Sequence, residues 1–187
     1  KTVGRINANC EMKLVDNDGN EVPVGEVGEG LVRSPAVFRG YIKNEELNKR
    51  VLDNGWFHTE DLLRRDEDGF YYLVDRKKDV IITGGENLYP VQIEDFLRAN
   101  IKIKDVAVIG LPDERLGEIA AAIIELKPGV SANEEEINEF CAELPRYKRP
   151  RKIIFADVPR NPTGKIEKPK LREIYCGERL VEAQTTK

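Results

Sequence analysis

The sequence predicts an α+β fold, in which an antiparallel β-rich first part is followed by a small α/β domain. Up to residue 77, apolar and polar residues alternate in short runs separated by glycine-containing turns, as is typical of antiparallel strands. From residue 78 onward, apolar β-type runs alternate with stretches in which apolar residues recur at helical spacing. We therefore expect two domains, 1–77 and 78–187, which meet in the charged run DRKKD.

The first part is expected to hold two hairpins with a helix between them. Residues 10–35 alternate around an Asp-Gly turn, and residues 55–76 do so around another. The stretch KNEELNKRVL, residues 43–52, predicts the helix. The run DNDGNEVPVGE invites comparison with a calcium loop, but its glycine stands one place early and the other ligand positions fail, so a turn is predicted instead.

The second part is expected to alternate strands with helices. Pro90 suits the first turn of a helix, and Ser131 and Glu134 are spaced for a capping box. A pair of glycines at 84–85 ends the first strand and is expected to lead from it into the following helix. The expected strands are 79–83, 103–112, 119–127 and 151–157, and the expected helices are 89–100, 133–144 and 170–175.

Composition excludes several classes of protein. The chain has 187 residues, enough to bury a sizeable core, and its charged fraction of 34% and apolar fraction of 40% suit a globular protein. The net charge of −4 argues against nucleic acid as the main partner, because a surface that follows phosphates usually needs a basic excess. No apolar run is long enough to form a transmembrane segment and no signal peptide opens the chain, so we expect a cytoplasmic protein.

The cysteines and the histidine do not predict a metal site. Three well-separated cysteines and one histidine give neither a CxxC pair nor a zinc spacing, so we interpret the cysteines as reduced structural thiols. His58 has no partner identifiable from sequence, and a hydrogen-bonded structural role is favoured over that of a catalytic base. The chain opens at Lys1 in strand-like sequence, and its only methionine is Met12. We interpret it as a segment of a longer protein.

Two local features admit both a structural and a functional interpretation. The run PTGKI lacks the first glycine and the Ser or Thr of a Walker-type phosphate loop, which is therefore excluded. Lys165 still follows a tight turn, and a point charge held there would suit a phosphorus centre under attack, although most loop lysines are only solvated. The pair Gly84-Gly85 either satisfies a turn that needs positive φ or lays bare backbone against a thin ligand. Residue types alone leave both open.

Three segments together resemble one family. GWFHTED, VDRKKDVIITGGENLYPVQIE and PRNPTGKIEKPKL occur in the order and at the approximate separations seen in acyl-CoA synthetases of the adenylate-forming superfamily. That superfamily also includes the luciferases and the adenylation domains of peptide synthetases. The similarity covers essentially the whole chain and corresponds to the last third of such an enzyme. Three ordered motifs of this length are far more specific than a lone TGK.

The resemblance implies an AMP-forming acid–thiol ligase. Such enzymes activate a carboxylic acid with ATP to an acyl-adenylate, release pyrophosphate, and pass the acyl group to a thiol, usually coenzyme A. It implies that residues 1–77 end a large N-terminal domain with a β-rich partial barrel. Residues 78–187 would be the mobile C-terminal lid. Mg²⁺, the main phosphate loop and the acyl pocket would belong to the missing N-terminal part, which would be the partner of this region.

The resemblance also assigns roles to individual residues. Asp61 would accept hydrogen bonds from the ribose hydroxyls of ATP, and Arg76 would hold the same nucleotide. Lys165 would be the catalytic lysine that positions the carboxylate and the α-phosphate. Lys78 would be the hinge about which the lid rotates. Gly84, Gly85 and Glu86 would line the tunnel for coenzyme A. Asn87 would contact the nucleotide, at a position where many relatives carry arginine.

Two motifs set this chain apart from parts of the family. The usual Thr-Gly-Asp reads Thr59-Glu60-Asp61, and glutamate disfavours the left-handed backbone that glycine allows. GGENLYP and FHT resemble the acyl- and fatty-acyl-CoA ligase branch rather than the peptide-synthetase branch. Coenzyme A is therefore the expected acceptor, and a fatty acid the expected substrate class.

Alternative functions remain open at this stage. The chain could belong to an adenylating domain that loads a carrier-protein thiol, to a luciferase-like oxidative enzyme, or to a non-catalytic binding module derived from the lid. We expect the 187-residue chain to fold at least from Asp79 onward but to catalyse no adenylation alone. Neither the acyl chain length nor the oligomeric state can be predicted from this region.

Overall fold

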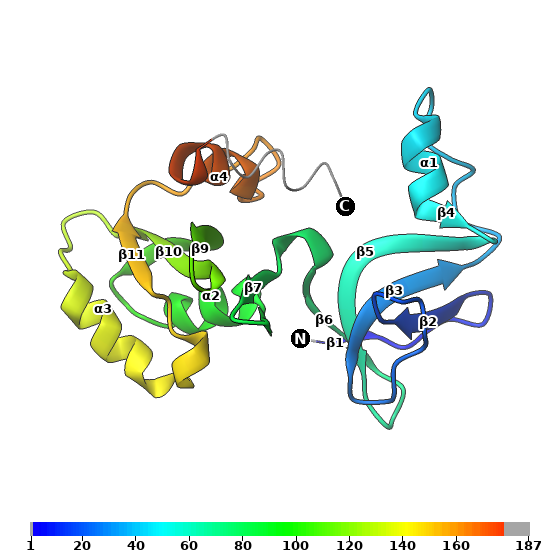
Figure 1. Cartoon of the computed structure of the whole chain (residues 1–187), viewed down its shortest axis with the longest axis horizontal. Helices are drawn as coiled ribbons and strands as arrows, with labels where there is room; N and C mark the ends of the chain where they lie inside the picture. Colours follow the sequence, from blue (N-terminus) through cyan, green and yellow to red (C-terminus); the bar gives the residue numbers. More distant parts are fainter. Residues whose placement is uncertain (1, 178–187) are drawn as a thin grey trace. The chain divides into compact units, whose positions relative to one another are not determined.

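The computed structural model describes residues 2–177 of the 187-residue chain. The chain divides into two compact units between Lys78 and Asp79 (Figure 1). Unit 1 ends at Lys78 and unit 2 begins at Asp79. Strands and helices occur in both units, so the predicted α+β class is confirmed.

Unit 1 is an open antiparallel sheet with one short helix. Its elements are β1 (Thr2–Gly4), β2 (Glu11–Val15), β3 (Val27–Arg33), α1 (Glu45–Val51), β4 (Leu52–Asp53), β5 (Trp56–Arg65) and β6 (Tyr71–Arg76). The strand order is β1-β6-β5-β3-β2, with β4 against β5, so the sheet does not close into a barrel. The two expected hairpins, β2–β3 and β5–β6, and the expected helix are all present.

The apolar core of unit 1 is small. Leu14, Leu63 and Tyr71 form its buried cluster, and Ile6 and Met12 are among the partly buried residues that pack against it. The stabilisation available from burying apolar surface scales with the area removed from water, so this cluster contributes little compared with the core of unit 2.

Unit 2 contains a second sheet that is covered by helices on both faces. Its elements are β7 (Ile81–Thr83), β8 (Glu86–Leu88), α2 (Pro90–Arg98), β9 (Ile103–Asp113), β10 (Gly117–Leu126), α3 (Glu134–Phe140), β11 (Lys152–Phe155) and α4 (Lys168–Cys176). Short 3₁₀ turns lie at Lys77–Asp79, Cys141–Glu143 and Arg146–Lys148. β10 pairs antiparallel with β9 and parallel with β11, and β7 joins it at Gly117.

Alternate residues of β9 supply the two buried layers of unit 2. Val106 and Val108 belong to the cluster that includes Ile93 of α2 and Ile137 of α3. Ala107 and Ile109 face the other way, into the cluster that includes Leu171 of α4. Figure 1 shows α4 on one side of the sheet and α2 and α3 on the other. Burial on both faces explains why these strands read as nearly continuous apolar runs.

Two local predictions for unit 2 need correction. The glycines at 84–85 do not lead from a strand into a helix, because β8 intervenes and pairs with β7 as a tight hairpin. The predicted capping box is also wrong: Asn133 caps α3, and its side chain accepts a 2.8 Å hydrogen bond from the Glu136 backbone N–H. Asparagine satisfies a free N–H of the first turn as well as serine does, and here it lies closer to the start of the helix.

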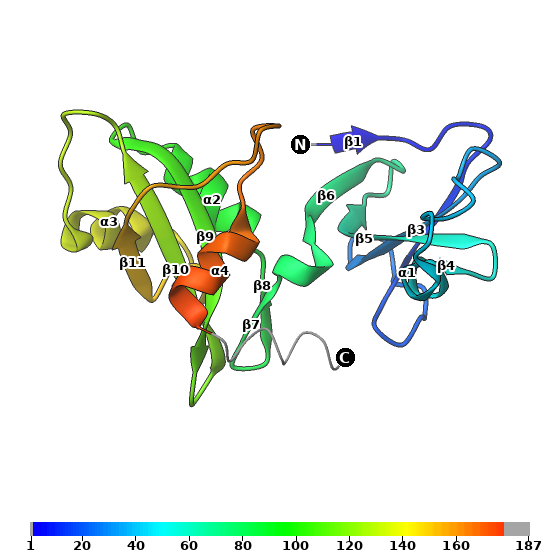
Figure 2. The same cartoon turned by 90° about the horizontal axis from the view of Figure 1, so that it is seen from above.

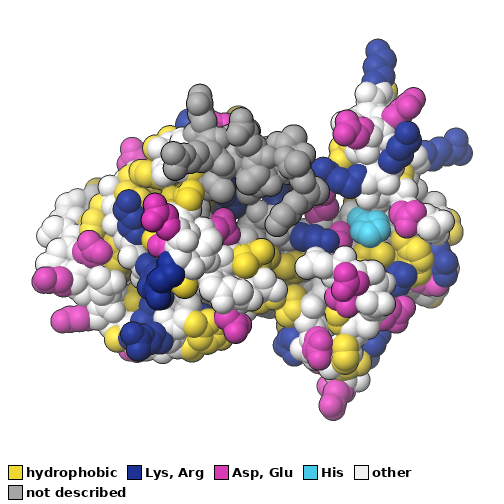
Figure 3. Space-filling model, in the orientation of Figure 1, with side chains coloured by type: hydrophobic (Ala, Val, Ile, Leu, Met, Phe, Trp, Pro, Cys, Tyr) yellow, Lys and Arg dark blue, Asp and Glu magenta, His cyan; other side chains and the backbone are white. Residues whose placement is uncertain are grey.

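The surface mixes charges of both signs. On the face drawn in Figure 3, lysine and arginine side chains are interspersed with aspartates and glutamates. Several exposed ion pairs contribute to this pattern, including Arg33 with Glu11 and Arg98 with Asp95. Within residues 2–177, none of the helices combines the length and the apolar character needed to cross a bilayer.

Candidate functional site

The strand β5 bulges where it carries the first candidate residues. Residues 59–61 lie opposite the single residue Gly30 of β3, because the pairing register shifts there. The Thr59 hydroxyl donates a 2.7 Å hydrogen bond to the Gly30 carbonyl and accepts one of 3.2 Å from the Asp61 N–H. We call residues 59–61 the β5 bulge. Bulges of this kind re-aim a side chain out of the regular alternation, and here the side chain is that of Asp61.

The middle residue of the β5 bulge has a strained backbone. Glu60 has φ +58°, in the left-handed region that glycine occupies freely and glutamate rarely does. Its N–H donates to Oε1 of Glu29 at 3.3 Å, and its carboxylate pairs with Arg50 at 2.9 Å. A Cβ on the facing Gly30 would lie 2.3 Å from Leu63 Cδ1, so a larger residue there would require the buried Leu63 side chain to shift. Glu60 thus adopts a left-handed backbone that glycine would occupy without strain.

Asp61 and Arg76 face each other across β5 and β6. They are direct register partners, and Arg76 Nε lies 3.8 Å from Asp61 Oδ1. Both side chains remain accessible, with exposures of 40% and 56%. Burial raises the pKa of Asp61 and neighbouring Glu60 adds to this, while Arg76 opposes it only in part. A poorly solvated carboxylate with reachable oxygens gains from hydrogen-bond donors such as vicinal hydroxyls.

A buried carboxylate lies beneath the bulge. Glu29 is 5% exposed, and its oxygens lie 2.8 Å from Lys77 Nζ, 3.3 Å from the Glu60 nitrogen and 3.4 Å from Nδ1 of His58. His58, the cyan side chain in Figure 3, is therefore in contact with a structural carboxylate. Glu29 was not among the residues predicted from the sequence motifs. Its signal is a charge on the same strand face as Val27 and Leu31, where an apolar residue is expected.

The unit boundary is fixed on each side. Lys77 is paired with Glu29 of unit 1, whereas Asp79 is buried and accepts a 2.7 Å hydrogen bond from Arg172 of α4 in unit 2. Lys78 between them is exposed, and its side chain makes no ion pair with any residue from 2 to 177. The structure thus leaves Lys78 as the least restrained residue of this turn.

The glycine pair forms the tip of the β7–β8 hairpin. Thr83 pairs with Glu86, so Gly84 and Gly85 are the two loop residues, with φ +60° and +86°. Two positive φ values in a two-residue loop are the signature of a type I′ turn. A Cβ on Gly85 would meet nothing within 4 Å, whereas one on Gly84 would lie 3.3 Å from Leu116. The turn alone therefore explains both glycines, and the open space beside Gly85 leaves room for a ligand.

The other two residues of this hairpin to which the family resemblance assigns a role also lie at the surface. Glu86 and Asn87 are exposed, and Asn87 is the register partner of Ile82 on β7. β7 joins the hairpin to β10 by pairing at Gly117, and further hydrogen bonds run from the Gly84 N–H to the Leu116 carbonyl and from the Ile82 N–H to Oε2 of Glu118.

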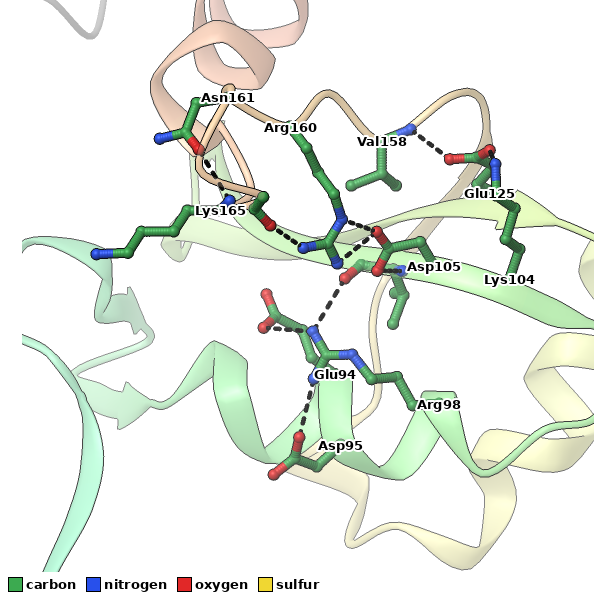
Figure 4. Close-up of polar contacts among 12 residues, drawn as sticks. Glu94, Asp95, Arg98, Lys104, Asp105, Glu125, Val158, Arg160, Asn161 and Lys165 are labelled. Carbon is green, nitrogen blue, oxygen red and sulfur yellow. Dashed lines mark hydrogen bonds and ion pairs between the residues drawn. The ribbon is translucent and has the colours of Figure 1, made fainter. Parts of the chain in front are cut away.

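Lys165 lies on a tight turn between β11 and α4. The side chain of Asn161 organises the turn, since its Oδ1 accepts from the N–H of Thr163, the hydroxyl of Thr163 and the N–H of Lys165. The Asn161 N–H in turn donates to the Lys165 carbonyl at 2.9 Å. The Lys165 side chain is exposed and makes no ion pair within the described residues (Figure 4). Its ammonium is therefore available to an anionic ligand.

The structure groups the assigned residues into three sites. Asp61 and Arg76 form one in unit 1; the β7–β8 hairpin and the Lys165 turn are separate places in unit 2. Figure 2 shows the hairpin tip and the loop before α4 (orange) at opposite ends of unit 2. The hairpin tip and the Lys165 turn are therefore separate surfaces of unit 2.

No candidate metal centre emerges from these residues. Within residues 2–177, no three His, Cys, Asp or Glu side chains gather closely enough to hold a metal ion. Cys141 is buried in the core of unit 2, and burial raises the pKa of its thiol to about 11, so it stays protonated at neutral pH. The thiols of the described residues are free, without disulfides.

Comparison with known proteins decides the family. Residues 92–165 match the AMP-binding enzyme C-terminal domain, and residues 1–42 match the AMP-binding enzyme family. The chain belongs to the AMP-binding enzyme family. Its resemblance to adenylate-forming enzymes is thereby confirmed.

Curated relatives to which this chain is similar include CoA ligases. It is 44% identical over 176 residues to the long-chain-fatty-acid–CoA ligase FadD13 of Mycobacterium tuberculosis, covering 93% of this chain and 35% of the relative. It is 40% identical over 167 residues to the 2-succinylbenzoate–CoA ligase of Bacillus cereus, covering 88% and 34%. The chain thus spans about a third of the length of these relatives.

The fold agrees with that of a solved member of the family. ATP-bound MatB from Rhodopseudomonas palustris superposes with a TM-score of 0.87 at 35% identity, covering 94% of this chain and 36% of MatB. At this identity and score, the path of the backbone is shared over nearly all of the described residues.

Proposed function

We propose that this chain is the C-terminal region of an ATP-dependent acyl-CoA synthetase, which activates a carboxylic acid, of fatty-acid type, as an acyl-adenylate and transfers the acyl group to coenzyme A. The observation that carries the proposal is the available ammonium of Lys165, held on an ordered turn in an AMP-binding chain. The similarity to FadD13 supports a fatty acid, and the similarity to the 2-succinylbenzoate–CoA ligase supports coenzyme A as the acceptor.

In the first half-reaction, a carboxylate oxygen attacks the α-phosphorus of ATP. The new O–P bond forms as the bond to the bridging oxygen of the β-phosphate breaks, and pyrophosphate leaves with that electron pair. Lys165 would approach the attacking carboxylate and the α-phosphate, where two anions are brought together. A fixed ammonium offsets their repulsion and the charge that builds up in the transition state.

Asp61 and Arg76 would bind the nucleotide in both half-reactions. The Asp61 carboxylate only accepts hydrogen bonds when ionised, which suits the two ribose hydroxyls. Arg76 lies directly across the strand pair and near the unit boundary, so it can stay with the nucleotide while the lid moves. We assign no Mg²⁺ ligand to this chain, because its described residues contain no suitable cluster; Mg²⁺ would be held by the remainder of the enzyme.

In the second half-reaction, the thiol sulfur would attack the acyl carbonyl carbon and lose its proton to solvent, while the C–O bond to AMP breaks and AMP leaves with the electron pair. The β7–β8 hairpin, with Gly84, Gly85 and Glu86, would then line the path of the pantetheine arm, and Asn87 would lie toward the nucleotide. The glycines allow an amide-containing chain to approach the backbone closely. Rotation about Lys78 would exchange the Lys165 turn for this hairpin.

The experiment is a hybrid enzyme in which this chain replaces the matching region of FadD13. We expect it to form AMP and an acyl thioester only when ATP, a carboxylic acid and coenzyme A are all present. A panel of acids would identify the substrate. An inactive hybrid, or one that transfers the acyl group to a carrier protein but not to coenzyme A, would contradict the proposal, and the second outcome would favour a carrier-loading enzyme instead.

A further inference from the structure

The turn that carries Lys165 is held by a side chain that the proposed mechanism does not use. Arg160 reaches across the loop, and its Nη1 donates to the carbonyl of Gly164, the residue directly before Lys165 (Figure 4). The Nε and Nη2 atoms of the same guanidinium both lie 2.6 Å from Oδ2 of Asp105. Arg160 thus ties the peptide next to Lys165 to the sheet.

Asp105 is itself a fixed point. It lies in β9 and is 8% exposed, and its Oδ1 accepts a 2.9 Å hydrogen bond from the Val106 N–H. The hydrogen bond to Asp105 raises the pKa of Arg160, so the guanidinium stays charged. A hydrogen bond between two charged groups is stronger than one between neutral groups. A guanidinium presents several donors in a rigid plane, so it can fix a carbonyl and a carboxylate in one geometry.

The remaining contacts of the loop act on its two ends. At its start, the Val158 N–H donates a 3.1 Å hydrogen bond to Glu125, whose other oxygen is paired with Lys104. At its end, the buried Lys168 of α4 lies 2.8 Å from Oε1 of buried Glu94 in α2. These contacts fix where the loop leaves and rejoins the core. They do not reach the peptide of Lys165.

Within the loop, the backbone forms a small ladder. Arg160 and Ile166 are bridge partners, and the Glu167 N–H donates to the Pro159 carbonyl at 2.9 Å. Lys165 therefore projects from a hairpin-like turn. Among the hydrogen bonds and ion pairs of residues 2–177, only those of the Arg160 side chain connect this turn to β9. Displacing this turn by about 1 Å would move the ammonium by a distance that can cost a hundredfold in rate.

We propose that Arg160, held by Asp105, is a positioning residue for Lys165 in the adenylation half-reaction. This inference rests on the proposed function of Lys165. Arg160 does not touch the reacting atoms; it sets the direction from which the ammonium approaches them. Replacing it should therefore slow adenylation, while leaving the second half-reaction, in which the lid presents its other face, close to its original rate.

The test uses the hybrid enzyme with Arg160→Ala, Arg160→Lys and Asp105→Asn. We expect Arg160→Ala to lower kcat of acid-dependent pyrophosphate exchange by roughly 10- to 100-fold, with little change in the KM for ATP. Thioester formation from preformed acyl-adenylate should be retained. Lysine cannot reproduce the two-sided contact, so Arg160→Lys should recover only part of the rate. Asp105→Asn keeps one acceptor oxygen and should give an intermediate loss, even if the alanine variant folds poorly.

A double variant separates positioning from general structural support. If Arg160 acts through Lys165, then Arg160→Ala should have almost no further effect on exchange in a Lys165→Ala background. Lys102→Ala is the matched control, because it removes another cation of unit 2, one paired at 2.6 Å with Glu136 away from this loop. It should leave both half-reactions unchanged.

Three results would overturn the inference. The first is an equal loss in both half-reactions for the Arg160 variants, and the second is a full additional loss in the Lys165→Ala background. Failure of the proposed function is distinguishable, since Lys165→Ala would then leave exchange intact. Loss of exchange in Lys165→Ala but not in any variant of Arg160 or Asp105 would contradict this inference alone.

Discussion

Lys77 and Glu29 form an ion pair of 2.8 Å in which the carboxylate is almost fully buried and the ammonium is half exposed. This pair holds the last turn of unit 1 one residue before Lys78, and Arg172 holds Asp79 in unit 2 one residue after it. We propose that a rotation between the units would turn about the backbone of Lys78. Confinement of this kind favours two defined states over a loose tether.

Replacing Lys77 and replacing Glu29 should reduce local stability by different amounts. Lys77→Met leaves a buried carboxylate without its cation, and we expect a loss of about 2 kcal/mol in local stability. Glu29→Gln leaves an ammonium that water can solvate, with an expected loss of about 1 kcal/mol. Amide hydrogen exchange in β3 and β5 of the hybrid enzyme measures both. Equal losses would show that burial of the carboxylate does not matter.

Replacing the strained glutamate of the β5 bulge should stabilise the protein. Glu60→Gly relieves a left-handed backbone that costs about 1–2 kcal/mol and gives up a surface ion pair with Arg50 worth less than about 1 kcal/mol. Thermal unfolding of the hybrid enzyme should shift upward. Glu60→Ala is the control, because it removes the ion pair but keeps the strain, so it should be neutral or destabilising. A stabilising alanine would refute the strain account.

Replacing Gly85 with asparagine distinguishes a glycine that serves the turn from a glycine that leaves room for a ligand. It tolerates positive φ, so Gly85→Asn should preserve the type I′ turn while placing a side chain in the open space beside it. We expect adenylation to continue and thioester formation to fall by roughly tenfold or more, as when a side chain obstructs a narrow path. If both half-reactions fall equally, or neither does, the glycines serve only the turn.

The two units should differ in their ability to fold as isolated fragments. Unit 2 has two buried clusters, one on each face of its sheet, whereas unit 1 has a single small one. We expect a fragment from Asp79 onward to unfold cooperatively in denaturant, and a fragment of residues 1–78 to show no cooperative transition. The 187-residue chain should form no acyl-adenylate alone. Cooperative unfolding of the shorter fragment would show that its core suffices.

Local sequence patterns predicted most of the helices and strands, because these elements depend on residues that are close together along the chain. The hairpins of unit 1, the strand β9 and the helix α2 follow directly from alternation, apolar runs and the position of Pro90. The β8 strand could not be recognised in this way, since three residues, two of them exposed, carry no periodic signal.

The pairs that organise the candidate site were beyond the reach of the sequence. Arg160 and Asp105 are 55 residues apart, and Glu29 and Lys77 are 48 apart. Only the fold brings such charges together. Resemblance supplied Asp61, Arg76 and Lys165, but the left-handed Glu60 could be found only from the backbone, because its side chain disfavours the conformation that the motif needs.

The most direct test of the central claim measures the two half-reactions of the hybrid enzyme carrying Lys165→Ala. If Lys165 brings the carboxylate and the α-phosphate together, acid-dependent pyrophosphate exchange should fall by at least roughly a hundredfold, while preformed acyl-adenylate and coenzyme A still give thioester at a rate close to that of the parent. Unchanged pyrophosphate exchange would contradict the account.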